Sequence, residues 1–171
     1  IDRFTGSETE VIIPNTIDGI PVTTIGTGAF SNCTSIKSIS IPNTVSTIRQ
    51  TAFLNCRSLI SVYIPDTVNY IGYSAFYGCT ALSSIHIPNS VTTLGESTFR
   101  SCSSLTSISI PDSIDTIRSE TFLGCSSLIS ITIPDNVYRI GDYAFSHMDS
   151  LKKVIEDMPE SFSAEESEEN K

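Results

Sequence analysis

The sequence lacks the motifs by which most enzymes and membrane proteins are recognised. Its only two histidines, His86 and His147, lie 61 positions apart, and no G-x-S-x-G, H-E-x-x-H, P-loop or dinucleotide-binding motif occurs. No apolar run approaches the ~18 residues that a membrane-spanning helix needs. The chain opens at Ile1 without methionine or the basic and apolar regions of a signal peptide, so we expect a mature or excised fragment. We predict no catalytic residues, no cofactor and no membrane span.

Charged side chains are also scarce, and most of the net charge lies at one end. They make up 17% of the residues, against 39% hydrophobic ones, which is typical of a soluble globular protein. Of the net charge of −9, residues 156–171 contribute seven acidic side chains and one lysine. The nearly neutral remainder offers no basic surface for nucleic acid or an anionic membrane. We predict an acidic, disordered tail over 158–171.

The chain does contain a repeat with a period of 23 residues. The phenylalanines in this period are Phe30, Phe53, Phe76, Phe99, Phe122 and Phe145. The prolines are Pro42, Pro65, Pro88, Pro111 and Pro134, and the cysteines are Cys33, Cys56, Cys79, Cys102 and Cys125. One unit, such as "IPDTVNYIGYSAFYGCTALSSIH", cannot bury its apolar side chains alone, whereas stacked copies can. The first unit carries about five extra residues, roughly "IDGIP", between Thr16 and Val22.

Each unit predicts two short strands and one tight turn. The pattern Leu-x-x-Val-x-Ile at 59–64 ends in three alternating residues, which is typical of a half-buried strand, and the following proline ends it. "VNYI" at 68–71 predicts a second extended segment. "GYSAFYGC" at 72–79 is too short for a helix and predicts a tight or 3₁₀-like turn. The sequence therefore predicts a mainly β, right-handed solenoid of about six coils with parallel strands.

The repeat also resembles a known family. "IPxxVxxIGxxAFxxCxxLxxIxIP" is similar to the BspA-like leucine-rich repeats of bacterial and protozoan surface proteins, and residues 5–33 resemble that family's first coil. Arg49 and Arg118 depart from the pattern, because they replace the turn glycine. The resemblance implies a leucine-rich-repeat solenoid over 1–157, with a degenerate coil over 1–40 and regular coils over 41–155. It implies a scaffold at the cell surface rather than a catalytic site.

The cysteine column is predicted to be packing. Five is an odd number, and no two cysteines lie close enough in sequence for a zinc motif such as C-x₂-C. Stacking would bring cysteines of neighbouring coils together, so a metal or a strained disulfide is an alternative. Met148 occupies the same column in the last coil, and methionine shares only apolar bulk with cysteine. This substitution favours a ladder of buried free thiols.

A second polar column follows the prolines. Its members are Asn43, Asp66, Asn89, Asp112 and Asp135. A ladder of calcium ions is conceivable there, but Asn and Asp at a turn usually bond to local backbone groups. We favour the turn role and predict no metal.

Exposed residues over a constant framework are the candidate recognition surface. The outward positions of the first strand are varied, although many are serine or threonine, and one coil carries four tyrosines where other coils have polar residues. Scattered surface tyrosines are the alternative interpretation. The candidate binding residues are Tyr63, His86, Ile60 and Lys37 on the first strand face, and Tyr70, Tyr73 and Tyr77 on the opposite segment and its turn.

The function predicted from these features is non-enzymatic. We expect an extracellular or cell-surface module that contacts another protein, such as a host or matrix protein in adhesion. The alternative is a structural spacer or accessory repeat region in a larger surface protein. We expect a monomer that binds no nucleic acid.

Overall fold

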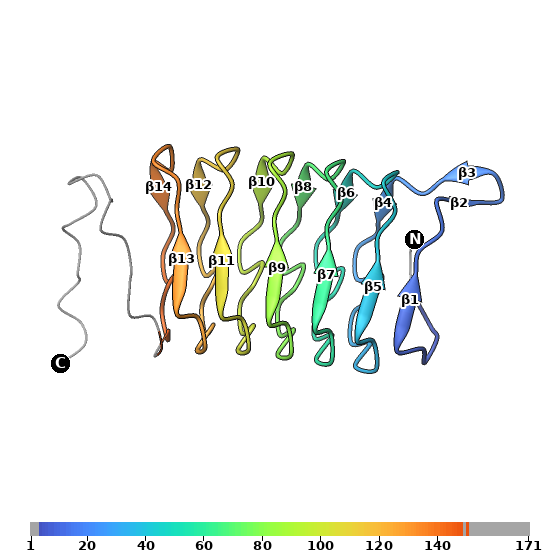
Figure 1. Cartoon of the computed structure of the whole chain (residues 1–171), viewed down its shortest axis with the longest axis horizontal. Helices are drawn as coiled ribbons and strands as arrows, with labels where there is room; N and C mark the ends of the chain where they lie inside the picture. Colours follow the sequence, from blue (N-terminus) through green and yellow to red (C-terminus); the bar gives the residue numbers. More distant parts are fainter. Residues whose placement is uncertain (1–3, 149, 151–171) are drawn as a thin grey trace.

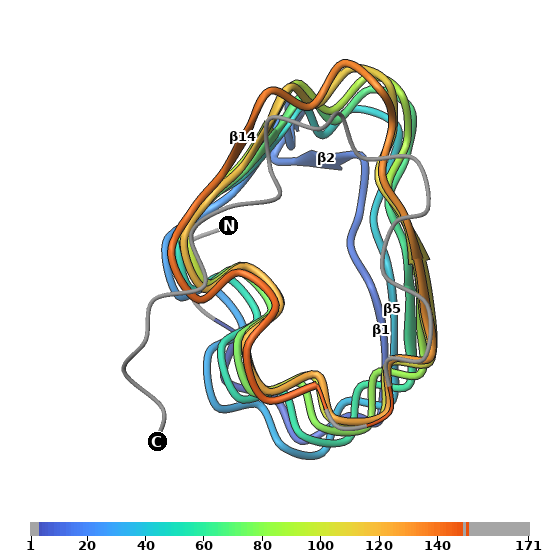
Figure 2. The ribbon, with the colours of Figure 1, turned by 90° about the vertical axis from the view of Figure 1, so that its left-hand side faces the viewer.

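The computed structural model describes residues 4–148 and 150 of the chain. These residues form a stack of similar coils made of short strands and turns, without a helix (Figure 1). Viewed along the stack, the backbones of successive coils nearly superimpose (Figure 2). The predicted solenoid with a 23-residue period is thus confirmed. The predicted end of the solenoid at 151–157 and the acidic tail at 158–171 lie outside the described residues.

The first series of strands forms one long wall of the stack. Its members are β1 (Glu10–Ile12), β5 (Ser38–Ser40), β7 (Ser61–Tyr63), β9 (Ser84–His86), β11 (Ser107–Ser109) and β13 (Ser130–Thr132). The pairing is parallel and in register, so that Ile39 lies opposite Val62 and Val62 opposite Ile85. These central residues are buried and their neighbours are exposed, as the period of two requires. The strand ends one residue earlier than predicted, because Pro65 has no N–H with which to extend the ladder.

The second series of strands lies on the opposite wall (Figure 2). Its members are β4 (Thr24–Ile25), β6 (Thr47–Ile48), β8 (Tyr70–Ile71), β10 (Thr93–Leu94), β12 (Thr116–Ile117) and β14 (Arg139–Ile140). Each has only two residues, the second of which points into the core. The extended segment predicted at 68–71 is therefore present in its second half.

The extra residues of the first coil form a hairpin that projects from the stack (Figure 1). Strands β2 (Thr16–Ile17) and β3 (Ile20–Pro21) pair antiparallel, with Ile17 opposite Ile20. The two turn residues, Asp18 and Gly19, have φ angles of 51° and 77°. Positive φ at both positions is typical of a type I′ turn, whose twist matches that of the flanking strands.

The turn segment at 72–79 is a run of consecutive β-turns. The N–H groups of Ala75, Tyr77 and Cys79 each donate to the carbonyl three residues earlier, at 3.2 Å. Ser74 and Gly78 interrupt this pattern with φ angles of 51° and 71°. These left-handed residues separate the i→i+3 bonds that a 3₁₀-helix would have in succession.

The alternate N–H groups of this segment point to the next coil. Those of Ser74, Phe76 and Gly78 donate to carbonyl oxygens 22 residues later in the chain, at 2.8–2.9 Å. The equivalent bonds recur in every neighbouring coil pair, from Phe30 N–H donating to Ala52 to Phe122 N–H donating to Ala144. The turns therefore form a third ladder of hydrogen bonds along the stack. We call the side of the stack that these turns make up the turn side.

The core behind the turn side is a column of phenylalanine rings. Successive rings from Phe30 to Phe145 stack with centroids 5.1–5.8 Å apart and planes within 10° of parallel. Phe4 lies on the first ring at 5.4 Å and tilted, so it covers the N-terminal end of the column. Because each ring contacts its neighbours in two coils, the aromatic column links all the coils.

The strand ladders, in contrast, are interrupted once. Within the described part of the chain, no ladder joins β9 to β11 or β10 to β12. A Cβ atom added to Gly95 would collide with the backbone of Tyr73 in the preceding coil, and Gly72 and Gly141 are equally close to theirs. Arg118 carries such a Cβ atom in the coil after the break. Arg49 carries one too, yet β4 and β6 remain paired, so this side chain alone does not explain the break.

Candidate functional site

The strand face brings together four of the predicted binding residues. Tyr63 is 62% exposed and lies directly opposite His86 across the parallel pair β7–β9. Ile60 precedes β7 and is 49% exposed, and its N–H donates to the carbonyl of Lys37 at 3.0 Å. Tyr63, His86, Ile60 and Lys37 thus belong to three neighbouring coils of one exposed surface, which we call the strand face.

The other three tyrosines do not share that surface. Tyr70 lies in β8 on the opposite wall, flanked in register by Thr47 and Thr93. Tyr73 and Tyr77 belong to the turn side, where they line one cavity of about 300 Å³. The structure therefore separates the predicted residues into the strand face, the isolated Tyr70 and this cavity, which we call the Tyr73–Tyr77 cavity.

The Tyr73–Tyr77 cavity has a charged pair at its edge. The Arg100 guanidinium lies 5.5 Å from the centroid of the Tyr77 ring and forms an ion pair with Glu120. The Ser97 hydroxyl donates to the same Glu120 oxygen, Oε2, at 3.0 Å. The sequence reasoning missed Arg100 and Ser97, although the 23-residue period places both one coil after residues near Tyr77. Residues 23 positions apart lie next to each other in a stack, so this spacing was the available signal for Arg100 and Ser97.

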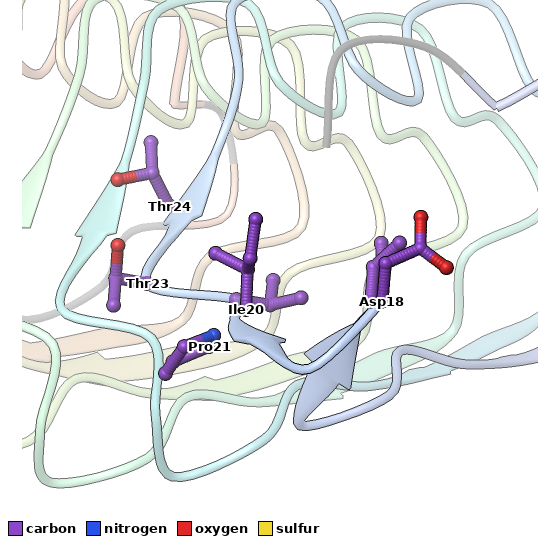
Figure 3. A pocket seen from close by; sticks show the side chains of 7 residues that line it. Asp18, Ile20, Pro21, Thr23 and Thr24 are labelled. Carbon is purple, nitrogen blue, oxygen red and sulfur yellow. The ribbon is translucent and has the colours of Figure 1, made fainter.

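The hairpin carries a second cavity that the sequence reasoning missed. It has a volume of about 330 Å³ and includes Ile17, Ile20 and Pro21 among its lining residues. Figure 3 shows Ile20 and Pro21 along the connection that leads to Thr24 of β4, with the Asp18 carboxylate at the turn. Ile20 is 70% exposed, which is unusual for so apolar a residue. The dipeptide Asp-Gly between two isoleucines was the signal for this hairpin.

The cysteine column has the geometry of packing. The thiols of Cys56, Cys79, Cys102 and Cys125 donate to phenylalanine carbonyls of the preceding coil at 3.0–3.3 Å. Burial raises the pKa of the Cys56 and Cys125 thiols to about 12 and raises that of Cys79 and Cys102 as well. These thiols are therefore protonated at neutral pH. Cys33, in the first coil, is only half-buried.

Metal ligands do not cluster in the described ranges, 4–148 and 150. No group of three or more His, Cys, Asp and Glu residues there could hold a metal ion. No helix in this part of the structure has the length and apolar character needed to cross a membrane.

Parallel strands with a 23-residue period and a leucine- and isoleucine-lined core define a leucine-rich-repeat solenoid. The sequence profile of the family described as "BspA type Leucine rich repeat region" matches residues 4–128 and 46–164, in six copies. The chain belongs to this BspA-type leucine-rich-repeat family. No curated protein matches the chain.

Solved bacterial structures share the fold. A leucine-rich repeat protein of T. pallidum aligns with a TM-score of 0.74 and 27% identity over 88% of this chain and 81% of its own. A leucine-rich repeat protein of Bacteroides ovatus has a TM-score of 0.68 and 34% identity over 87% of this chain. A leucine rich cell surface protein of Faecalibacterium prausnitzii has a TM-score of 0.72 and 29% identity, also over 87%. The chain spans 46% and 48%, respectively, of the last two proteins.

Proposed function

We propose that this chain is a non-enzymatic, cell-surface or extracellular module that binds a protein partner through its strand face. The observation that supports this proposal is the pair Tyr63 and His86, which lie side by side on neighbouring parallel strands. Ile60 adds exposed apolar area beside them, and Lys37 adds a positive charge. An aromatic and apolar centre surrounded by small polar residues is the usual composition of a binding hot spot.

The class of protein supports the cell-surface location in this proposal. The Faecalibacterium prausnitzii structure is of a cell surface protein, and it supports the same location for this chain. Stacked repeats offer an extended, rigid surface that is well suited to contact with another protein, such as a host or matrix protein in adhesion. Because the fold itself does not define a function, the proposal depends on the strand-face residues.

A structural spacer is the second candidate, and one observation favours it. The strands beyond His86 carry Ser107, Ser109, Ser130 and Thr132, which offer little contact area, and the large exposed residue on this part of the face is Ile129. A spacer needs only a soluble, stiff stack, and these coils meet that need.

A capture experiment followed by a measurement of binding affinity distinguishes the protein-binding module from the structural spacer. The immobilised 171-residue chain is incubated with serum and matrix proteins, the captured proteins are identified, and one is purified for equilibrium binding. We expect Tyr63→Ala to weaken that binding by about 2 kcal/mol, or roughly 30-fold. His86→Ala should weaken it less, because the smaller ring buries less area.

Two controls make the result specific. Tyr138→Ala removes an equally exposed tyrosine beside β14 on the opposite wall, and Ser107→Ala changes the strand face away from Tyr63. Both should bind like the original chain and keep its melting temperature. If no protein is captured, or if Tyr63→Ala binds as well as Tyr138→Ala, the spacer is the better description.

A further inference from the structure

The Tyr73–Tyr77 cavity extends along the axis of the stack across three coils. Two columns of residues with 23-residue spacing line it, together with Tyr73. The hydroxyl column is Thr51, Ser74 and Ser97, and the large-residue column is Leu54, Tyr77 and Arg100. Equivalent residues of neighbouring coils follow one another along the stack, so the lining follows the stack axis, and we also call this cavity the groove.

One buried hydroxyl in this groove has no protein partner. Ser74 is only 4% exposed, and among the described residues its side chain makes no hydrogen bond. Nevertheless, no side-chain oxygen or nitrogen in the described part of the chain is both fully enclosed and unpaired. The Ser74 oxygen therefore opens into the cavity that it lines, where it can donate one hydrogen bond and accept up to two. A buried polar group in this state favours a ligand with hydroxyl groups.

The charge of the groove is balanced. Arg100, which lines the groove, is paired with Glu120, which lies outside the lining, so the pair has no net charge. The guanidinium has N–H donors beyond the ion pair that can bind neutral hydroxyls.

The backbone of the groove excludes an extended peptide bound by strand addition. The N–H groups of Ser74 and Phe76 donate to Glu96 and Thr98 of the next coil at 2.9 Å. Because these donors are used along the whole turn side, no free strand edge is available there for β-augmentation.

The aromatic residues complete the chemistry of the groove. Tyr73 is 51% exposed, whereas Tyr77 is half-buried and the Arg100 guanidinium lies over its ring, so Tyr73 is the residue that offers an open ring face. A tyrosine ring offers an apolar face on which a flat row of C–H groups can stack, and its hydroxyl remains available. A volume of about 300 Å³ is at the small end of the range for ligand pockets, which suits a small ring rather than a protein segment.

From these observations we propose that the Tyr73–Tyr77 cavity binds a neutral saccharide. One sugar ring stacks on Tyr73, its hydroxyls bond to Ser74 and to the Arg100 guanidinium, and the adjoining units extend along the groove. This site is on a different wall from the strand face, so it operates whether or not the strand face binds a protein.

Saturation-transfer NMR on the 171-residue chain tests the proposal. The probes are three neutral oligosaccharides (chitotriose, maltotriose and lactose) and one sulfated disaccharide from heparin. We expect transfer from the tyrosine rings to the ring C–H protons of at least one neutral probe, with millimolar affinity. Absence of transfer to all three neutral probes, or transfer only to the sulfated one, would overturn the proposal.

Two variants locate the binding in the groove. Tyr73→Ala should reduce affinity for the responding sugar by at least about tenfold, because the stacking face is lost. Ser74→Gly removes the unpartnered hydroxyl at a position where φ is 51°, which glycine adopts readily, so the fold should be retained. It should reduce affinity by at least about threefold.

The matched controls are Tyr63→Ala on the strand face and Tyr138→Ala on the opposite wall. Both should leave the transfer unchanged. If Tyr73→Ala does not fold, Ser74→Gly alone carries the test. Unchanged sugar binding in Ser74→Gly, or equal loss in Tyr138→Ala, would show that the sugar binds elsewhere.

Discussion

The turn side and the strand walls follow the same 23-residue period but hold the coils together differently. On the turn side, backbone hydrogen bonds and stacked phenylalanine rings continue without interruption from Phe30 to Phe145. On the strand walls, both ladders stop between the coil of β9 and β10 and the coil of β11 and β12. The third ladder is therefore regular where the strand walls are joined by fewer bonds, such as those from the Thr106 N–H to the Ser83 carbonyl at 3.4 Å and from the Ser113 hydroxyl to the Val91 carbonyl at 2.6 Å.

This difference indicates which part of the repeat tolerates variation. The turn side uses every alternate N–H for a neighbouring coil and places left-handed residues such as Ser74 and Ser97 where those bonds require them. The strand face needs an inward-pointing apolar residue, such as Val62 or Ile85, and its outward residues are exposed. Exposed positions over a regular stack can vary more than the positions of the turn side, which agrees with the proposed role of the strand face.

The largest expected effect is the loss of a ring from the phenylalanine column. Phe76 is fully buried between two stacked rings, at 5.1 and 5.7 Å. Phe76→Ala should lower the free energy of unfolding by roughly 3–5 kcal/mol, measured by urea denaturation. Phe145→Ala, at the partly buried end of the column, should cost less. Equal effects of the two changes would argue that the column does not link the coils.

Gly95→Ala tests how closely neighbouring coils approach. The new Cβ atom would meet the backbone of Tyr73 and Gly72, which cannot move like a flexible side chain. We expect a loss of about 1–3 kcal/mol in unfolding free energy, as is usual when a packed site is overfilled. Arg118→Ala is the control, because Arg118 already has a Cβ atom at the same repeat position, and it should change stability little.

High pH should weaken the buried thiol column. Burial raises the pKa of the Cys56 thiol from about 9 to about 12, so the thiol is held protonated in the folded chain. Its contribution to stability is complete below pH 9 and is lost as pH rises from about 9 through about 12. The loss has an upper limit of about 1.4 kcal/mol per pH unit for each thiol. Cys56→Ala should show a flatter decline of unfolding free energy above pH 9 than the original chain.

Thiol labelling provides an independent check on the same column. At pH 8 one thiol, the half-buried Cys33, should react first, and the other four should react only on unfolding. Rapid labelling of Cys79 in the folded chain would contradict the buried arrangement.

The smallest expected effect is a difference in amide protection where the pairing between β10 and β12 is missing. Hydrogen exchange can detect it. The Thr92 and Tyr138 N–H groups donate to the preceding coil at 3.0 Å, whereas the equivalent N–H of Asp115 has no partner among the described residues. The Asp115 amide should therefore exchange faster than the other two. Arg118→Gly should slow its exchange if the arginine helps to hold the coils apart. Equal protection of all three amides would show that the ladder is continuous.

The sequence was informative wherever a side chain points into the stack. The columns of Phe76, Cys79 and Val62 were predicted as core because their apolar character recurs in every coil, and all three are buried. The candidate site was predictable only in part. Tyr63 and His86 were assigned to one face from the period-two alternation of their strands, and the register of β7 and β9 places them side by side.

By itself, the sequence determined the period and the core, because burial in a stack repeats whenever the residue pattern repeats. Only the tertiary structure decided which exposed residues meet. Tyr73 and Tyr77 come together with Arg100 because stacking makes residues 23 positions apart neighbours, and because left-handed residues such as Ser74 redirect the turn. Serine carries no sequence signal for a positive φ, unlike glycine, so the shape of this groove could not be read from the chain.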